Sequence, residues 1–329
     1  MLMLIQGKFR PPVPRPAVSP DEAAHAYDVA GRSYRDYADG DTDGLFDFSS
    51  RYSFADRQIW HRLDAVLVGM AAEGRRSVSI LDVGCGPGTW LQRIIIRAGN
   101  LGFTRITARG FDISPAMIEL ALSGTRAAAS TLAPGQVRLS IQLGDACREL
   151  QEPDRSADLC LCLYGVLNHL PREALPELAS ELVRVTAREL FVTVRAAGSL
   201  PTIYVDSLDR ARDFRQDNDA DRMEIDLLDG RHLSFRSHLF RAADLRALFA
   251  PHVPAPCLTG LDLFHSRFAT DPRWNPDALA TEPVFAERLA RLEQFCSSDP
   301  GFIDRAAHIM LQASIGAVQP SSRPMTRAV

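Results

Sequence analysis

Apolar residues in the middle of the chain alternate between short continuous runs and stripes at helical spacing. The segments SVSILDV at 77–83 and ADLCLCLY at 157–164 are such runs, and they are typical of strands covered on both faces. Between the runs, segments such as SPAMIELALSGTRAAA at 114–129 are periodic like helices, with Pro115 in the first turn. This alternation predicts an α/β fold with a doubly wound, mostly parallel sheet of seven strands. The seven predicted strands span residues 77–83, 106–113, 137–145, 157–164, 189–196, 257–266 and 306–315.

The N-terminal part of the chain has a different pattern. Residues 1–20 end in the proline-rich PPVPRPAVSP and predict a disordered arm. Residues 21–75 predict a helical cap of two helices, separated by the turn-forming ADGDTDG. The second of these helices runs from about Phe54 to Met70. The first carries one stripe at helical spacing, formed by Tyr27, Ala30, Tyr34 and Tyr37.

Residues 76–317 predict the main domain, in which two insertions interrupt the alternation. The insertion at about 199–240 contains a turn signal, Asp229-Gly230, between two strand-like runs, which indicates a β-hairpin. The insertion at about 268–300 has a helical pattern around FAERLARLEQFC. Together these insertions predict a lid of hairpin and helix. Residues 318–329 predict a disordered tail.

The stretch ILDVGCGPGTW at residues 80–90 marks the candidate site. Gly84, Gly86 and Gly88 follow the first predicted strand, and ligands of doubly wound sheets bind at the carboxyl ends of the strands. Glycines there let a ligand lie directly against the backbone. The spacing differs from the G-x-G-x-x-G dinucleotide fingerprint, which disfavours a nicotinamide-dependent dehydrogenase. A phosphate-binding P-loop is excluded, because the only lysine of the chain is Lys8.

Four motifs in order resemble the class I S-adenosylmethionine (SAM)-dependent methyltransferases. ILDVGCGPGT resembles the first motif of that family, GFDISPAMIELA the second and QLGDA the third, and ADLCLCLYGVLNHLP resembles the motif of the fourth strand. They cover about residues 78–195. The resemblance implies SAM as cofactor, with S-adenosylhomocysteine (SAH) as product.

The resemblance also implies individual roles in holding the cofactor. Asp112 is expected to hold the ribose hydroxyls, and Ile113 to pack on the adenine. Asp145 and Ala146 are expected at the adenine edge, and Asp82 near the ammonium group. One departure is that Asp112 stands 24 residues after Gly88, further than is usual in the family. The implied cofactor contacts are Tyr27, Tyr34, Asp82, Gly84, Gly86, Gly88, Asp112, Ile113, Asp145, Ala146 and Leu163. For Asp82 and Asp145 the alternative is turn or cap chemistry, and for the tyrosine stripe it is packing in the core.

Methyl transfer depends mainly on holding nucleophile, methyl group and sulfur in line, and a base helps only when the nucleophile must lose a proton. His169, in the loop after the fourth strand, is the candidate catalytic base. Its alternatives are a bond to the backbone, or contact with SAM without proton transfer. Tyr37, His265 and Arg267 are candidates for the substrate pocket, and so is His238; a structural or exposed role is the alternative for the histidines and the arginine. No cluster with the spacing of metal ligands stands out, so we predict no metal.

Composition and charge restrict the kinds of partner that we expect for this chain. The 329 residues carry a net charge of −4, and without a basic patch this predicts no nucleic-acid partner. The six cysteines include no C-x-x-C pair, and no apolar run is long enough to span a membrane. These features predict a cytoplasmic protein that is not in a membrane. We expect a monomer or a homodimer. The D-P-P-Y type of motif found in amino-group DNA methyltransferases is missing after the fourth strand.

A closed pocket under a lid favours a small-molecule acceptor methylated on O, N or C, in bacterial secondary metabolism. A protein or RNA methyltransferase, or a non-catalytic SAM-binding protein, remains the alternative.

Overall fold

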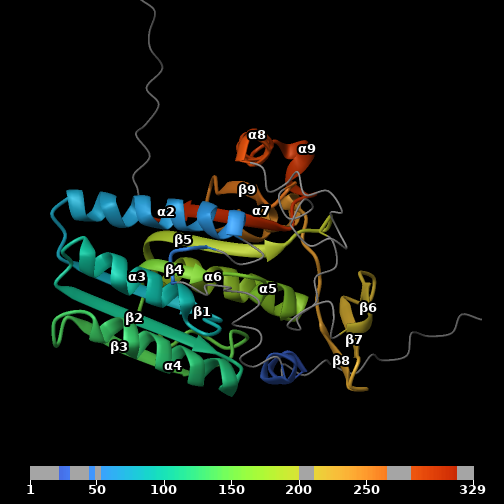
Figure 1. The fold of residues 1–329 in the computed structure, drawn as a ribbon, viewed down its shortest axis with the longest axis horizontal. Coiled ribbons are helices and arrows are strands. Elements are labelled where there is room, and N and C mark those ends of the chain that lie inside the picture. Colours follow the sequence, from blue (N-terminus) through green and yellow to red (C-terminus); the bar gives the residue numbers. More distant parts are fainter. Residues whose placement is uncertain (1–21, 30–43, 49–52, 200–210, 265–282, 317–329) are drawn as a thin grey trace, which may run out of the picture.

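The computed structural model describes residues 22–29, 44–48, 53–199, 211–264 and 283–316. Seven of its strands form the central sheet: β1 (Ser77–Val83), β2 (Arg105–Asp112), β3 (Val137–Leu143), β4 (Ala157–Cys162), β5 (Thr186–Arg195), β9 (Cys257–Leu261) and β10 (His308–Ser314). Their order across the sheet is β3-β2-β1-β4-β5-β10-β9 (Figure 1). Strands β1 to β5 are parallel, whereas β10 is antiparallel to both of its neighbours. The predicted doubly wound, mostly parallel sheet of seven strands is confirmed.

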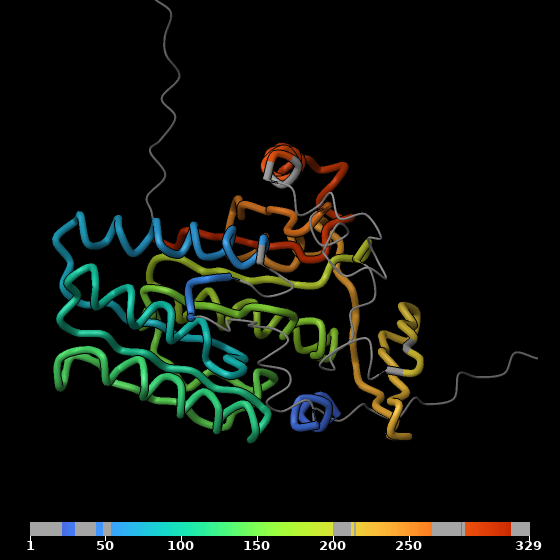
Figure 2. Tube along the Cα trace, in the orientation of Figure 1, coloured from blue at the N-terminus to red at the C-terminus, as the bar shows by residue number. Residues whose placement is uncertain are grey.

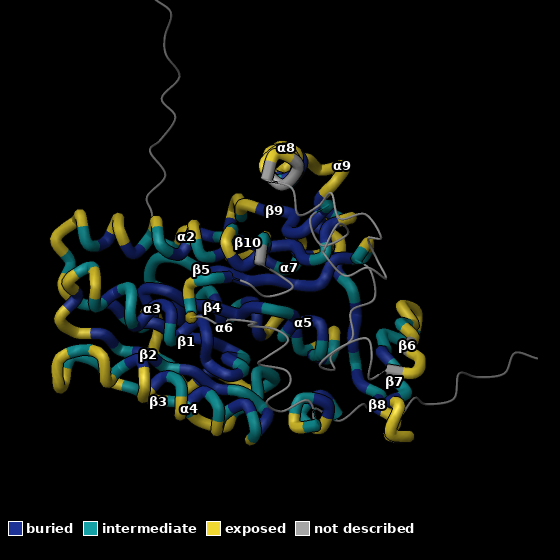
Figure 3. Tube along the Cα trace, in the orientation of Figure 1, coloured by how far each residue is buried: buried dark blue, intermediate teal, exposed yellow. Residues whose placement is uncertain are grey.

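Helices cover both faces of this sheet, and the period of two along the strands distributes the side chains between them. In β1, Ile80 packs into the core beneath one helix layer, whereas Leu81 packs into the core of the opposite face. Figure 3 shows the buried stretches along the central strands between the two layers. The first layer consists of α2 (Ser53–Ala72), α3 (Thr89–Asn100) and α4 (Pro115–Ser130), and the second of α6 (Leu175–Val185) and α7 (Ala242–Phe249).

A second, antiparallel sheet contains β6 (Ala211–Asp217), β7 (Arg222–Leu227) and β8 (His232–Arg236). The predicted hairpin is confirmed as β7 and β8, and β6 extends it to three strands. The helix at 22–29 lies beside this small sheet (Figure 2). Its Ala26 and Val29 join the small apolar core of the sheet. The small sheet and this N-terminal helix therefore form one packed unit, which we call the lid. It differs from the predicted lid of hairpin and helix, because α8 (Pro283–Cys296) packs elsewhere, against Leu263 and Ala306.

The remaining described elements are short or peripheral. They are α5 (Val166–His169), a 3-10 turn (Arg172–Ala174), α8 (Pro283–Cys296) and α9 (Pro300–Ile303). The predicted strand 257–266 is shorter than expected, because Asp262 has a positive φ of 57° that interrupts the extended chain after Leu261. The predicted arm and tail lie outside the described residues, as do Tyr34, Tyr37, His265 and Arg267.

The described helices include none that combines the length and hydrophobicity needed to cross a bilayer. In the same part of the chain, no three His, Cys, Asp or Glu side chains gather as metal ligands would. All six cysteines are described and unpaired, and Cys160 and Cys162 are buried side by side on one face of β4.

Candidate active site

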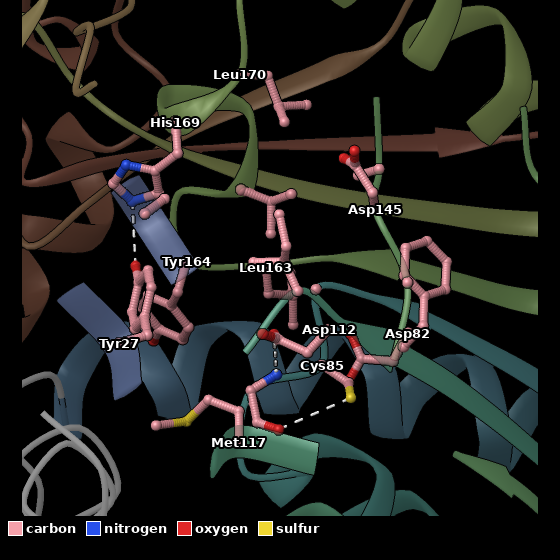
Figure 4. A pocket seen from close by; sticks show the side chains of 18 of the residues that line it. Tyr27, Asp82, Cys85, Asp112, Met117, Asp145, Leu163, Tyr164, His169 and Leu170 are labelled. Carbon is pink, nitrogen blue, oxygen red and sulfur yellow. Dashed lines mark hydrogen bonds between the residues drawn. The ribbon is translucent and has the colours of Figure 1, made fainter. Parts of the chain in front are cut away.

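A cavity lies at the carboxyl ends of β1 to β4, between the sheet and the lid (Figure 4). Counted out to its mouth, with open solvent included, it holds about 1260 Å³. Acids line it at the end of β1 (Asp82), at the end of β2 (Asp112) and after β3 (Asp145). Tyr27 reaches it from the N-terminal helix, and His169 from α5. The cavity thus brings together residues that are far apart in the sequence.

The glycine loop forms the floor of this cavity. The backbone amide of Gly84 donates to the carbonyl of Phe111 at 2.9 Å, which ties the loop to β2. Gly84 has a φ of 69°, and a Cβ there would lie 2.4 Å from Cγ2 of Val166. Gly86 has a φ of 51°, but a Cβ there would meet no atom within 4 Å. Gly84 is therefore required by the fold, whereas Gly86 leaves bare backbone beside the cavity.

Gly88 is predicted to contact the cofactor, but it lies outside the lining of the cavity. It precedes the first residue of α3 and does not line the cavity. A Cβ at Gly88 would lie 3.1 Å from Cα of Ala121, in α4. The absence of a side chain here serves the close approach of α3 and α4.

Asp112 is held rigidly at the end of β2. One carboxylate oxygen accepts from the amide of Gly86 at 2.9 Å, and the other from the amide of Ser114 at 2.9 Å. Burial raises the pKa of Asp112, and these amides oppose that shift. Ile113, which is predicted to pack on the adenine, lines the cavity next to it. The lid reaches this point through Asp28, whose carboxylate accepts from the Ser114 hydroxyl at 2.5 Å.

Asp82 lies deeper, at the end of β1, and is only 2% exposed. Its Oδ2 has no hydrogen-bond partner among the described residues. Burial, followed by the charge of Asp112, raises the pKa of Asp82 to about 8. A buried carboxyl group without a partner at a cavity wall is suited to pairing with a cationic ligand group.

The outer end of the cavity carries the third acid. Asp145 lines it together with Ala146, and one oxygen of Asp145 accepts from the amide of Cys147 at 2.8 Å. Leu163, at the end of β4, is buried and also lines the cavity. The predicted contacts Asp145, Ala146 and Leu163 thus share one cavity with Asp82 and Asp112.

His169 is half-buried and neutral, with a defined tautomer. Its Nδ1 lies 2.7 Å from the carbonyl oxygen of Arg236, and a carbonyl only accepts, so Nδ1 carries the proton. Nε2 then accepts from the hydroxyl of Tyr27 at 3.1 Å (Figure 4). Burial lowers the pKa of His169 to about 4. The imidazole therefore orients a tyrosine hydroxyl at the edge of the cavity.

Sequence reasoning missed a second polar pair in this cavity. Tyr164 follows β4 with a positive φ of 54°, and its hydroxyl donates to the carboxylate of Asp56 on α2. The ring of Tyr164 stacks on Trp90 of α3, with centroids 6.3 Å apart. A signal was present: Asp56 stands three residues before Ile59, on the stripe of α2 that faces the core. An acid on an apolar stripe needs a buried partner.

His238, considered for the substrate pocket, lies elsewhere. It is fully buried and does not line the cavity. Its ring packs against Phe240, with centroids 4.7 Å apart, and neither ring nitrogen has a hydrogen-bond partner among the described residues. Burial lowers the pKa of His238 to about 3. His238 is thus a neutral core residue.

Residues 80–189 match the family model of the methyltransferase domain. The matched part of this chain is similar to a methyltransferase domain. The match confirms the resemblance found in the four motifs, and the observed sheet order agrees with it. A search of curated proteins finds no significant match.

Several solved methyltransferase structures are similar to this chain. A magnesium protoporphyrin IX methyltransferase from Synechocystis PCC 6803 with bound SAM is 17% identical, over 92% of this chain and 99% of that one, with a TM-score of 0.48. A putative sarcosine dimethylglycine methyltransferase from Galdieria sulphuraria is 13% identical, over 78% of this chain and 87% of that one, with a TM-score of 0.45.

The matched residues do not form the cavity alone. Residues 80–189 supply Asp82, Asp112 and His169, among others. Three further residues of the lining, Ala23, Tyr27 and Arg236, come from the lid. A smaller part of the cavity wall, including these side chains, therefore lies in segments outside the matched residues.

Proposed function

We propose that this protein is a SAM-dependent methyltransferase that acts on a small-molecule acceptor. The observation that carries the proposal is the position of Asp112. Its carboxylate sits at the end of β2, oriented by the amides of Gly86 and Ser114, inside the cavity. An acid at this point of a doubly wound sheet binds the vicinal hydroxyls of a ribose.

The residues of the cavity fit SAM in further respects. Bare backbone at Gly86 leaves room for a ligand, and the partnerless Oδ2 of Asp82 suits the ammonium group of the methionine part. Ile113 and Ala146 offer apolar contact for the adenine. When bound, SAM supplies an electrophilic methyl group on a sulfonium.

Tyr27 and His169 are proposed to act on the acceptor. His169 is neutral and accepts a hydrogen bond from the Tyr27 hydroxyl, so it fixes the direction of that hydroxyl at the cavity. A pKa of about 4 makes His169 a weak base at neutral pH. Its role as catalytic base stays a prediction, and the geometry supports a positioning role better.

The lid supports a small acceptor rather than a protein or an RNA. Tyr27 and Arg236 of the lid form part of the cavity wall. The lid is also tied to the domain by Asp28 at the start of α4. A cavity with walls on several sides admits a small molecule more readily than a polymer.

Calorimetric titration with SAM and SAH, with NAD as the control ligand, tests this function. We expect micromolar binding of both sulfur ligands and none of NAD. Asp112→Asn should weaken the binding of SAM and of SAH by at least tenfold, because a neutral amide accepts fewer hydrogen bonds from the ribose. The matched control is Asp154→Asn, an exposed surface acid that does not line the cavity. Binding of NAD, or of no ligand by a folded protein, would contradict the proposal.

A screen of acceptors for SAH release then tests catalysis. Release of SAH that depends on an added small molecule is the expected result. SAH binding without turnover on any acceptor would favour the non-catalytic alternative.

A further inference from the structure

Arg236 is the only arginine or lysine among the described residues that line the cavity. It ends β8, and its side chain is half-buried. Its backbone carbonyl accepts from His169, but its guanidinium forms no ion pair or hydrogen bond with the described residues. The described residues therefore use none of the donors of the guanidinium.

Two other arginines of the small sheet form ion pairs, whereas Arg236 forms none with the described residues. Arg215 pairs with Glu224 at 2.8 Å, and Arg222 pairs with Glu22 at 3.1 Å. Arg236 also stands directly opposite Arg222 in the β7–β8 pairing. Like charges opposite each other destabilise an antiparallel pair. Stability of the sheet therefore does not account for an arginine at position 236.

The acids of the cavity do not neutralise Arg236 either. Asp56 accepts from Tyr164, and Asp112 accepts from two backbone amides. Asp145 accepts from the amide of Cys147. Asp82 lies at the glycine loop, where the methionine part of SAM is proposed to bind. Each of these acids thus has a partner among the described residues or in the proposed cofactor, whereas the guanidinium forms no ion pair or hydrogen bond with the described residues.

The neighbourhood of the guanidinium places it toward the outer end of the cavity. Burial and the charge of Asp145 raise the pKa of Cys147 to about 11, and the charge of Arg236 acts in the opposite direction. Burial raises the pKa of Asp221, whereas its pairing with Arg172 and the charge of Arg236 lower that pKa. Arg236 is therefore within electrostatic range of both Cys147 and Asp221. It is also close to the Tyr27–His169 pair through its own backbone.

We propose that Arg236 anchors the carboxylate of an anionic small-molecule acceptor, an inference that rests on the proposed methyltransferase function. A planar guanidinium binds a carboxylate through two parallel hydrogen bonds. A single positive charge in a cavity with several acids favours a monoanion over a doubly charged phosphate. Arg236 would then act as a specificity determinant supplied by the lid.

Matched pairs of carboxylic acid and primary amide test this proposal, because they differ in charge and little in shape. The SAH-saturated protein is titrated with phenylacetate and phenylacetamide, with 3-phenylpropionate and its amide, and with indole-3-acetate and its amide. We expect the acid of at least one pair to bind about tenfold to a hundredfold more tightly than its amide. Arg236→Gln should remove this preference and leave the affinity for the amide unchanged. Arg215→Gln, on the same sheet and exposed, is the matched control.

Three outcomes overturn the proposal. The first is that no pair shows a preference for the acid, and the second is that the preference persists in Arg236→Gln. The third is that Arg236→Gln loses affinity for SAH but keeps its affinity for 5′-methylthioadenosine, which has no methionine carboxylate. The guanidinium would then hold the cofactor rather than the acceptor.

Retained SAH affinity in Arg236→Gln also shows that this variant is folded. If the wild-type protein binds no SAH, the proposed function fails. The same acid and amide titrations of the ligand-free protein then test Arg236 separately.

Discussion

The hydroxyl of Tyr27 lies 3.1 Å from Nε2 of His169, although 142 positions separate the two residues in the chain. This hydrogen bond joins the N-terminal helix to α5, directly at the cavity. The other ring nitrogen of His169 is bound to the carbonyl of Arg236 in the small sheet. One neutral imidazole therefore links both parts of the lid to the methyltransferase domain.

Removal of the Tyr27 hydroxyl should lower turnover more than cofactor binding. In Tyr27→Phe we expect kcat, on an acceptor found by the screen, to fall about tenfold to a hundredfold. The Kd for SAH should change less than threefold, because the ring is kept. Steady-state kinetics and calorimetry measure the two effects, with the exposed His25→Gln on the same helix as control.

The pH profile separates the two roles of His169. With its pKa near 4, a positioning histidine stays neutral above pH 5 and gives a flat kcat between pH 5.5 and pH 8. A rise in kcat with a midpoint near 6.5 would instead support the general base.

Binding of SAH should release a proton from Asp82. In the free protein the pKa of Asp82 is about 8, so its carboxyl group is protonated at pH 7. An ammonium partner favours the ionised form and lowers that pKa, so up to one proton leaves on binding. The affinity for SAH should accordingly rise as the pH rises toward 8. Titrations at pH 7 in phosphate and in Tris, which differ in ionisation enthalpy, measure this release.

The control for that release is Asp82→Asn, in which the binding enthalpy should no longer depend on the buffer. If the wild-type enthalpy is already the same in both buffers, Asp82 does not meet the ammonium group.

Alanine at the first two glycines of the loop should have different effects. In Gly84→Ala, the new Cβ would lie 2.4 Å from Val166 and φ is positive, so we expect a loss of about 2 kcal/mol or more in the free energy of unfolding. Gly86→Ala meets no neighbour, so it should lose only about 1 kcal/mol from its positive φ. Its methyl group would stand beside the cavity and weaken SAH binding.

Urea unfolding and SAH titration of both variants measure these effects. Equal destabilisation by the two substitutions would contradict the structural role assigned to Gly84.

Buried histidines should destabilise the protein in acid. Burial lowers the pKa of His238 to about 3, while an unfolded histidine titrates near 6.5. Between these values the unfolded chain binds one proton more, so stability falls as the pH drops from 6.5. The slope is about 1.4 kcal/mol per pH unit for one such histidine.

His238→Leu should reduce this acid slope by about that amount, as measured by urea unfolding between pH 4 and pH 7. His252→Gln, at an exposed position, is the control. An unchanged slope in His238→Leu would show that His238 is protonated in the folded state or does not control acid stability.

The sequence by itself determined the sheet and the part of the cavity that lies at its strand ends. Strand and helix periodicity is local, and the parallel topology follows from their alternation. Because parallel strands end at the same edge, Asp82, Asp112 and Asp145 had to lie near one another. The position of the single lysine, Lys8, far from the glycine loop in the chain, likewise excluded a P-loop.

Only the tertiary structure decided which residues from other segments complete the cavity wall. Tyr27, Asp56 and Arg236 lie on segments whose packing depends on long-range contacts, and no local pattern shows which of them meet. Gly88 and His238 illustrate the same limit: one is used for helix packing and the other for the core, although both have residue types suited to a site. Local chemistry states what a residue can do, whereas its burial and its partners, set by distant parts of the chain, decide what it does.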